Sequence, residues 1–283
     1  MPKNVRYMVV PVLLLLVSRE VMAQNLSLSV KLLNSSHKYK VQDKSRDLEA
    51  ELIFPSQALV GQIGYAYKTS NENLSLSFEH SLSSAHPTGT DTDWYRGDVS
   101  VYSQSKTSLE KYYALALNYE HSVLENLSIK TTLFHKYWKL DWSETRQYDY
   151  IDDTYSEFPS KSVRYTQTLN GITFSIGYHE ELFSIPLSMS IGAQAAKHKS
   201  VDEHLLRNFY TVSQDWLYGY LGSLSAELMQ GAEGVLQVVA AYEILSGESD
   251  MKFYSNNDFK YMTLPASFET KQKSIQLQYT LLF

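Results

Sequence analysis

The sequence predicts an all-β protein, a ten-stranded antiparallel transmembrane β-barrel with long extracellular loops and short periplasmic turns. Apolar residues alternate with polar ones over most of the chain, and short connections alternate with long ones. The chain has 22 Tyr, 4 Trp and 11 Phe, and after the first residues it contains no run of roughly 18 apolar residues that would form a membrane helix. Many aromatic residues and modest hydropathy together are typical of a barrel with a polar lumen.

The first residues predict a signal peptide. Lys3 and Arg6 precede the apolar run "YMVVPVLLLLV", and "VMA" then places small residues before a cleavage site after Ala23. The predicted domains are therefore a signal peptide at 1–23 and a barrel at 24–283. Cleavage removes three basic residues and one acidic residue, which changes the formal net charge from −6 to −8. An acidic chain argues against a nucleic-acid partner and favours cationic partners.

The first three predicted strands cover about 26–39, 46–69 and 74–84, and alternate in "NLSLSV" and "NLSLSFEHSL". The next four strands, which contain "YYALALNYEH", "NLSIKTTLFHKYW", "GITFSIGYH" and "LFSIPLSMSIG", cover 109–122, 127–147, 162–178 and 182–198. The last three, with "YGYLGSLSAELM", "GVLQVVAAYEIL" and "KSIQLQYTLLF", cover 207–229, 234–247 and 269–283. Pro55 in the second strand cannot donate a hydrogen bond to the ladder, so an irregularity is predicted there.

The connections fall into two classes. The predicted short turns lie at 70–73, 123–126, 180–181 and 230–234, and the longer polar loops at about 40–46, 85–108, 148–161, 199–206 and 248–268. Ten is an even number, so both termini are expected on the periplasmic side. The alternative, a soluble β-sandwich, would rarely sort its connections into a short set and a long set.

Two acidic motifs stand in loops that follow the third and seventh predicted strands. Asp91 and Asp93 are two residues apart, as are Asp202 and His204, so in an extended segment each pair shares one face. In a ten-stranded barrel these two loops face each other across the mouth. A carboxylate pair opposite an Asp–His pair can activate a water molecule, although an isolated Asp-X-Asp in a loop is usually only solvated.

"DTDW" and "DEH", in this order on a barrel of this length, resemble the omptin family of outer-membrane endoproteases. "WSETRQY" at 142–148, the segment from "DDTYSEFP" to "VRYTQ" at 152–167 and the terminal "LQYTLLF" are also similar to the family. The resemblance implies that Asp91, Asp93, Asp202 and His204 are catalytic. His204 is then the general base, Asp202 orients it, the other two carboxylates hold the water, and no metal or cofactor is required.

The resemblance also implies substrate and lipid contacts. The positions that select a basic residue in the family hold His37 and Ser200 here, neither of them acidic, so the preference beside the cut bond need not be basic. "VYSQSKTSLEKYY" stands where the family has a His-Pro signature. Lipopolysaccharide is the implied activating lipid, with Trp142, Glu144 and Arg146 predicted on one strand face. The other histidines have no metal-ligand spacing and are expected in the lumen, loops or turns: His80, His86, His121, His135, His179 and His198.

Two functions of different classes remain open. The first is an endopeptidase in the bacterial outer membrane, expected to be monomeric, with its site facing outward and with cationic peptides or surface and host proteins as substrates. The second is a proteolytically silent barrel that acts as an adhesin or passive surface protein. A small pore is disfavoured because side chains can fill a ten-stranded lumen.

Overall fold

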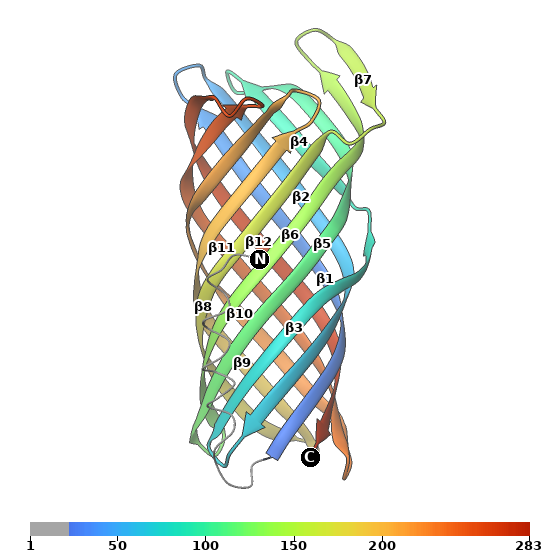
Figure 1. Cartoon of the computed structure of the whole chain (residues 1–283), viewed down its shortest axis with the longest axis vertical. Helices are drawn as coiled ribbons and strands as arrows, with labels where there is room; N and C mark the ends of the chain where they lie inside the picture. Colours follow the sequence, from blue (N-terminus) through green and yellow to red (C-terminus); the bar gives the residue numbers. More distant parts are fainter. Residues whose placement is uncertain (1–22) are drawn as a thin grey trace.

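In the computed structural model, which describes residues 23–283, the chain forms a closed tube of tilted antiparallel strands (Figure 1). The strands are β1 (Ala23–Asp43), β2 (Leu48–Lys68), β3 (Glu72–Ala85), β4 (Thr88–Tyr95), β5 (Asp98–Leu124), β6 (Leu127–Asp149), β7 (Thr154–Phe158), β8 (Val163–Leu182), β9 (Ile185–His204), β10 (Phe209–Gln230), β11 (Gly234–Ser255) and β12 (Lys260–Leu282). Within the described part of the chain, no helix has the length and apolarity needed to cross a membrane. Apart from Ala23, the predicted signal peptide lies outside the described residues.

The twelve strands occupy ten positions in the ring. β3 pairs with β2 and β5 in one half of the barrel, and β4 continues the same position between the same two neighbours. β7 pairs with β6 and forms a hairpin that projects from one end (Figure 1). The pairing of β1 with β12 closes the ring. The predicted ten-stranded antiparallel barrel is therefore confirmed.

The long loops predicted at one end of the barrel are mostly strand. β1 has 21 residues and β5 has 27, whereas a tilted strand needs only about 9–11 residues to cross a bilayer. The expected loop at 85–108 consists largely of β4 and the start of β5, joined at Arg96 and Gly97, both with positive φ (54° and 86°). The prediction was wrong because both faces of a strand are polar once it leaves the membrane, which removes the alternation.

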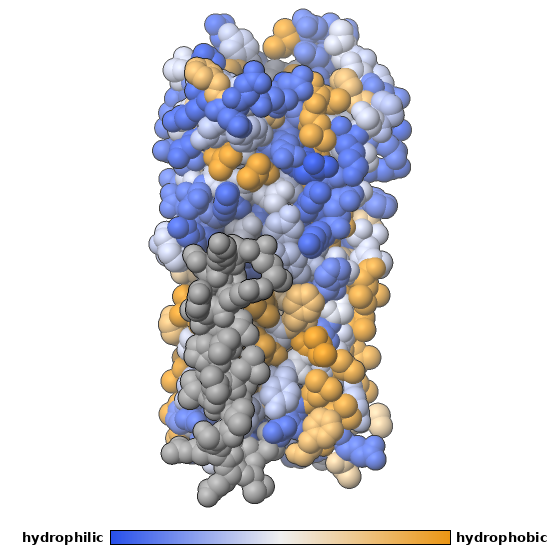
Figure 2. Space-filling view, viewed as in Figure 1, coloured by the Kyte–Doolittle hydropathy of each residue, from blue (hydrophilic) through white to orange (hydrophobic). Residues whose placement is uncertain are grey.

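The outer surface divides into two halves. One half carries apolar side chains in a broad band and the other is mainly hydrophilic (Figure 2). On β1 the exposed Leu28, Val30 and Leu32 mark the apolar half, and Asn34 and Lys38 continue the same outward face in the polar half. The C-terminus lies at the apolar end (Figure 1). This distribution is the one expected of a barrel whose apolar half is surrounded by lipid.

Pro55 lies where the third strand position is interrupted. β2 pairs with β4 up to Ile53 and resumes with β3 at Gln57, so the ladder is broken beside Pro55. A register shift follows between Leu59 and Val60. The predicted irregularity is confirmed, and it separates β3 from β4.

A layer of buried aromatic side chains fills the barrel in the polar half. Phe54 stacks on Trp142 with ring centroids 4.4 Å apart and on Tyr165 at 4.6 Å. These rings join others that are also buried, and we call the set the aromatic layer: Tyr39, Phe54, Trp138, Trp142, Tyr165 and Phe268. Offset and edge contacts of this kind add stability beyond that of the buried area alone.

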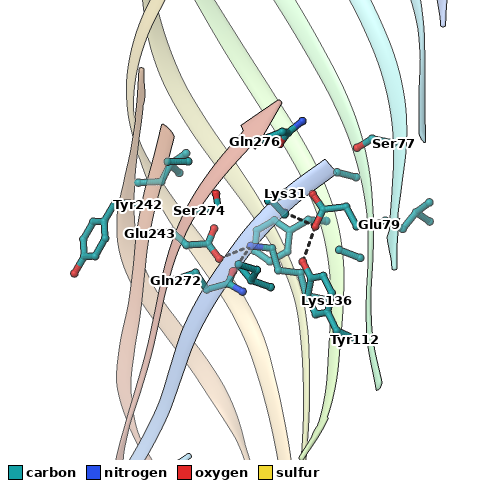
Figure 3. Close-up of a pocket in the computed structure, with 17 residues that line it drawn as sticks. Lys31, Ser77, Glu79, Tyr112, Lys136, Tyr242, Glu243, Gln272, Ser274 and Gln276 are labelled. Carbon is teal, nitrogen blue, oxygen red and sulfur yellow. Dashed lines mark hydrogen bonds and ion pairs between the residues drawn. The ribbon is translucent and has the colours of Figure 1, made fainter. Parts of the chain in front are cut away.

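The lumen of the apolar half contains paired charges around a cavity of about 220 Å³ (Figure 3). Lys31 Nζ lies 2.5 Å from Glu79 Oε2, and the Tyr112 hydroxyl donates to the same carboxylate at 2.6 Å. Across the cavity, Lys136 pairs with Glu243 (Figure 3). Charges that are removed from water are tolerated only when they are paired in this way.

Removing one partner of the Lys31–Glu79 pair is expected to destabilise the barrel. Glu79→Gln leaves Lys31 charged and unpaired in the lumen, which should cost on the order of 3 kcal/mol of unfolding free energy. The matched control is Glu269→Gln in the more exposed pair with Lys271, where we expect less than about 1 kcal/mol. Urea unfolding in detergent micelles, followed by tryptophan fluorescence, measures both. If both substitutions lowered the unfolding free energy equally, the Lys31–Glu79 pair would contribute no more to stability than the exposed pair, and the prediction would be contradicted.

Candidate active site

Both acidic motifs lie on strands at the mouth of the polar half. Asp91 and Asp93 are on β4, paired in register with Leu52 and Ala50 of β2. His204 is the last residue of β9. Asp91, Asp93 and His204 all line one cavity of about 330 Å³, although β4 and β9 are well separated around the ring. The structure therefore brings the two predicted motifs to one site.

Asp202 lies below His204 and is almost completely buried, with 1% of its surface exposed. His204 Nε2 is 3.3 Å from Asp202 Oδ2, and the Tyr39 hydroxyl donates a hydrogen bond to the same oxygen. A buried carboxylate needs such partners because it has lost its hydration. With Nε2 turned toward Asp202, Nδ1 is the imidazole nitrogen that can accept a proton from a water molecule.

The surroundings of His204 favour its protonated form. Burial lowers the pKa of His204, but the charges of Asp202 and Asp91 outweigh it, and the pKa is raised above its usual value of 6.5. The imidazole also stacks on Phe209 of β10, with ring centroids 4.2 Å apart and planes 16° apart. These contacts fix the orientation of the ring as well as its charge.

The carboxylates on β4 resist ionisation. Burial, followed by the negative charge of Asp93, raises the pKa of Asp91 from 3.8 to about 7. Burial also raises the pKa of Asp93, although the positive charges of Arg207 and His204 oppose this shift. Two neighbouring acids that share a desolvated site can hold a proton between them near neutral pH.

The two residues predicted to select the substrate, His37 and Ser200, do not line this cavity. His37 lies two residues below Tyr39 on β1, buried edge-on against Trp138 with centroids 5.0 Å apart. Burial lowers the pKa of His37 to about 3, so its ring is neutral. Ser200 lies two residues below Asp202 and is also buried. Neither residue therefore reaches the cavity, and a role for them in substrate selection stays a prediction.

The sequence predicts that Trp142, Glu144 and Arg146 share one strand face. This prediction is wrong for Trp142. Trp142 points into the barrel, is 1% exposed and belongs to the aromatic layer. Glu144 has a positive φ of 50° beside a register shift, and this bulge reverses the alternation. Glu144 and Arg146 do face outward, where Glu144 pairs with Lys106 at 2.5 Å. The spacing of the three residues in sequence gave no sign of the bulge.

Among the other histidines, His198 is fully buried in the lumen, with its ring 4.7 Å from Phe268. Burial lowers its pKa to about 4. Between residues 23 and 283, no group of three or more His, Asp or Glu side chains has an arrangement that could hold a metal ion.

Three residues of the site were not predicted from the sequence: Tyr39, Arg207 and Phe209. Tyr39 could have been suspected, since it is two residues beyond His37 on one strand face. Its contact with Asp202, however, joins residues 163 positions apart. Phe209 pairs in register with His204 only because the intervening turn is short.

The raised pKa of Asp91 predicts a pH-dependent gain in stability for Asp91→Asn. The folded-state pKa of about 7 lies above the ordinary 3.8, so between these values the folded protein binds more protons than the unfolded one. Stability contributed by protonated Asp91 is therefore lost as pH rises, at about 1.4 kcal/mol per unit of pKa shift. Asparagine cannot ionise. The unfolding free energy of the variant should therefore rise relative to that of the wild type as the pH increases from about 4 to about 8. Urea unfolding at both pH values measures this, with exposed Asp152→Asn as control. If the difference in unfolding free energy between Asp91→Asn and the wild type were the same at both pH values, the raised pKa of Asp91 would be contradicted.

The comparisons with known proteins agree with this architecture. The sequence matches no family model and no curated protein. The structure is similar to the crystal structure of the outer membrane protease OmpT from Escherichia coli, with 14% identity, a TM-score of 0.78, and coverage of 94% of this chain and 99% of that one. The translocator domain of the autotransporter NalP from Neisseria meningitidis also matches, at 10% identity and a TM-score of 0.43 over 98% of this chain and 95% of that one. The fold of the chain is therefore similar to that of the OmpT barrel.

Proposed function

We propose that the protein is an outer-membrane endopeptidase that hydrolyses peptide bonds with an activated water molecule. The observation that carries the proposal is the meeting of Asp91, Asp93 and His204 around one cavity, with His204 in contact with the buried Asp202. The similarity in fold to a protein described as an outer membrane protease supports the same activity. Neither motif alone would be sufficient, because loop carboxylates are usually only solvated.

In the proposed mechanism the water lies between the β4 carboxylates and His204. The imidazole Nδ1 takes a proton as the water oxygen attacks the carbonyl carbon of the peptide. The resulting imidazolium, stabilised by Asp202, then returns the proton to the leaving amine nitrogen as the carbon–nitrogen bond breaks. Asp91 and Asp93, whose pKa values are raised by burial, hold the water and the developing charge through hydrogen bonds.

The location of the site suggests its substrates and its lipid partner. It lies at the end of the barrel opposite the C-terminus, so we place it on the extracellular side, where it would meet cationic peptides and surface or host proteins. Lipopolysaccharide remains a proposed activating lipid, with Glu144 and the exposed Arg146 as contacts. Guanidinium groups bind phosphate well through paired hydrogen bonds.

His204→Ala is expected to abolish most of the peptide hydrolysis, since general-base assistance is worth about 10²–10⁴ in rate. The matched control is His86→Ala, an exposed histidine outside the cavity, which should keep wild-type activity. Digestion of a peptide library by purified protein in lipopolysaccharide, read by mass spectrometry, measures both. If the wild type is as inactive as His204→Ala, the proposal fails and a silent barrel with an adhesive role replaces it.

The contacts of His204 predict the pH dependence of the reaction. The base must be neutral, so the rate should fall as pH decreases through the raised pKa of His204. Tyr39→Phe removes the hydrogen bond to Asp202, which leaves the carboxylate charge more available to the imidazolium. This acid limb should then move upward by on the order of half a pH unit. The pH profile of kcat/KM measures the shift. A lower rate without any shift would show that Tyr39 only stabilises the fold.

A further inference from the structure

We propose that the cavity beside His204 binds an apolar side chain of the peptide, adjacent to the bond that is cut. This inference rests on the proposed endopeptidase function and adds a substrate class to it. The apolar lining, the pairing of the surrounding charges and the size of the cavity each support it.

The deeper wall of the cavity is apolar. Val41, Leu52 and Met251 line it, with 6%, 4% and 1% of their surfaces exposed. Met262 and Leu264 of β12 extend the same wall toward the mouth, where they are only partly buried. A peptide side chain of similar character would exclude water from this surface, at about 25 cal/mol for each square ångström buried.

The charged residues near the mouth already have partners. Glu49 pairs with Lys40, and Asp43 Oδ2 lies 3.7 Å from Arg46 Nε. Burial raises the pKa of Asp93, and the positive charge of Arg207 opposes this rise. An arriving lysine or arginine would therefore have to compete with cations of the protein itself.

The two buried positions below the apolar wall, His37 and Ser200, carry no carboxylate. The His37 ring packs against Trp138 and Tyr165, and burial keeps it uncharged. Ser200 is also buried.

A basic side chain that lay against Val41, Leu52 and Met251 would lose its hydration to an apolar surface, and such a loss is costly. Asp91 and Asp93 also line the cavity, but burial raises the pKa of each, so they resist the negative charge that would pair with a base. The same cavity therefore penalises Lys and Arg while it accepts Leu, Met or Phe.

The size of the cavity suits one or two side chains of an extended peptide. Its volume of about 330 Å³ is at the lower end of the range of roughly 300–1,000 Å³ found for ligand pockets. Asp91 and His204 lie on its surface, so the occupant would sit next to the reacting carbonyl group.

The test has one arm that needs catalysis and one that does not. In the library digest, cuts should be enriched at least about tenfold next to Leu, Met or Phe relative to Lys and Arg. Met262→Glu should shift this preference toward Lys and Arg. Thr263→Glu, which places the same charge on the exposed side of the same strand, should not.

The second arm uses the His204→Ala protein. Fluorescence anisotropy should show tighter binding of a labelled Leu-containing peptide than of the matched Lys-containing peptide, by at least about tenfold. This preference without cleavage by the wild type would support the pocket and refute the proposed hydrolysis. Cleavage next to Lys or Arg, or equal binding of the two peptides, would overturn the pocket and leave the hydrolysis standing.

Discussion

The hydrogen bond from Tyr39 to Asp202 joins the interior of the barrel to its candidate site. Asp202 is a buried carboxylate, and burying a charge without hydrogen-bond partners would destabilise the fold strongly. Tyr39 belongs to the aromatic layer, so the packing of that layer fixes the position of the hydroxyl that holds Asp202. Asp202 in turn contacts His204. The orientation of the imidazole thus depends on aromatic packing several residues deeper in the tube.

The position of the site on strands, not on loops, follows from the length of the strands. β4 and β9 carry the acidic motifs as extended, hydrogen-bonded segments, because the barrel continues beyond its apolar half. Residues held in a ladder on both sides need little reorganisation to reach a reactive geometry, which is the main requirement for electrostatic catalysis. The same rigidity applies to the apolar wall, since Leu52 and Met251 are also strand residues.

The sequence was sufficient for the ten strand positions of the ring and for Asp91, Asp93 and His204, which line one cavity. Alternation is reliable where one face of a strand meets lipid and the other meets the lumen, as at Leu28 and Leu32. It fails beyond the membrane, where both faces of a strand are polar, so the sequence predicts a loop where the structure has β4. The inward turn of Trp142 could not be predicted, because it depends on a bulge at Glu144. Tyr39 was missed because its partner is remote in sequence.

The aromatic layer also closes the lumen of the tube. Phe54 and Trp138 have no exposed surface, and the ionisable His37 and His198 among these rings are held neutral. The rings of this layer offer an ion no charged partner, and the Lys31–Glu79 pair lies in the other half of the tube. A small solute that entered the tube from its polar end would therefore be stopped at the aromatic layer.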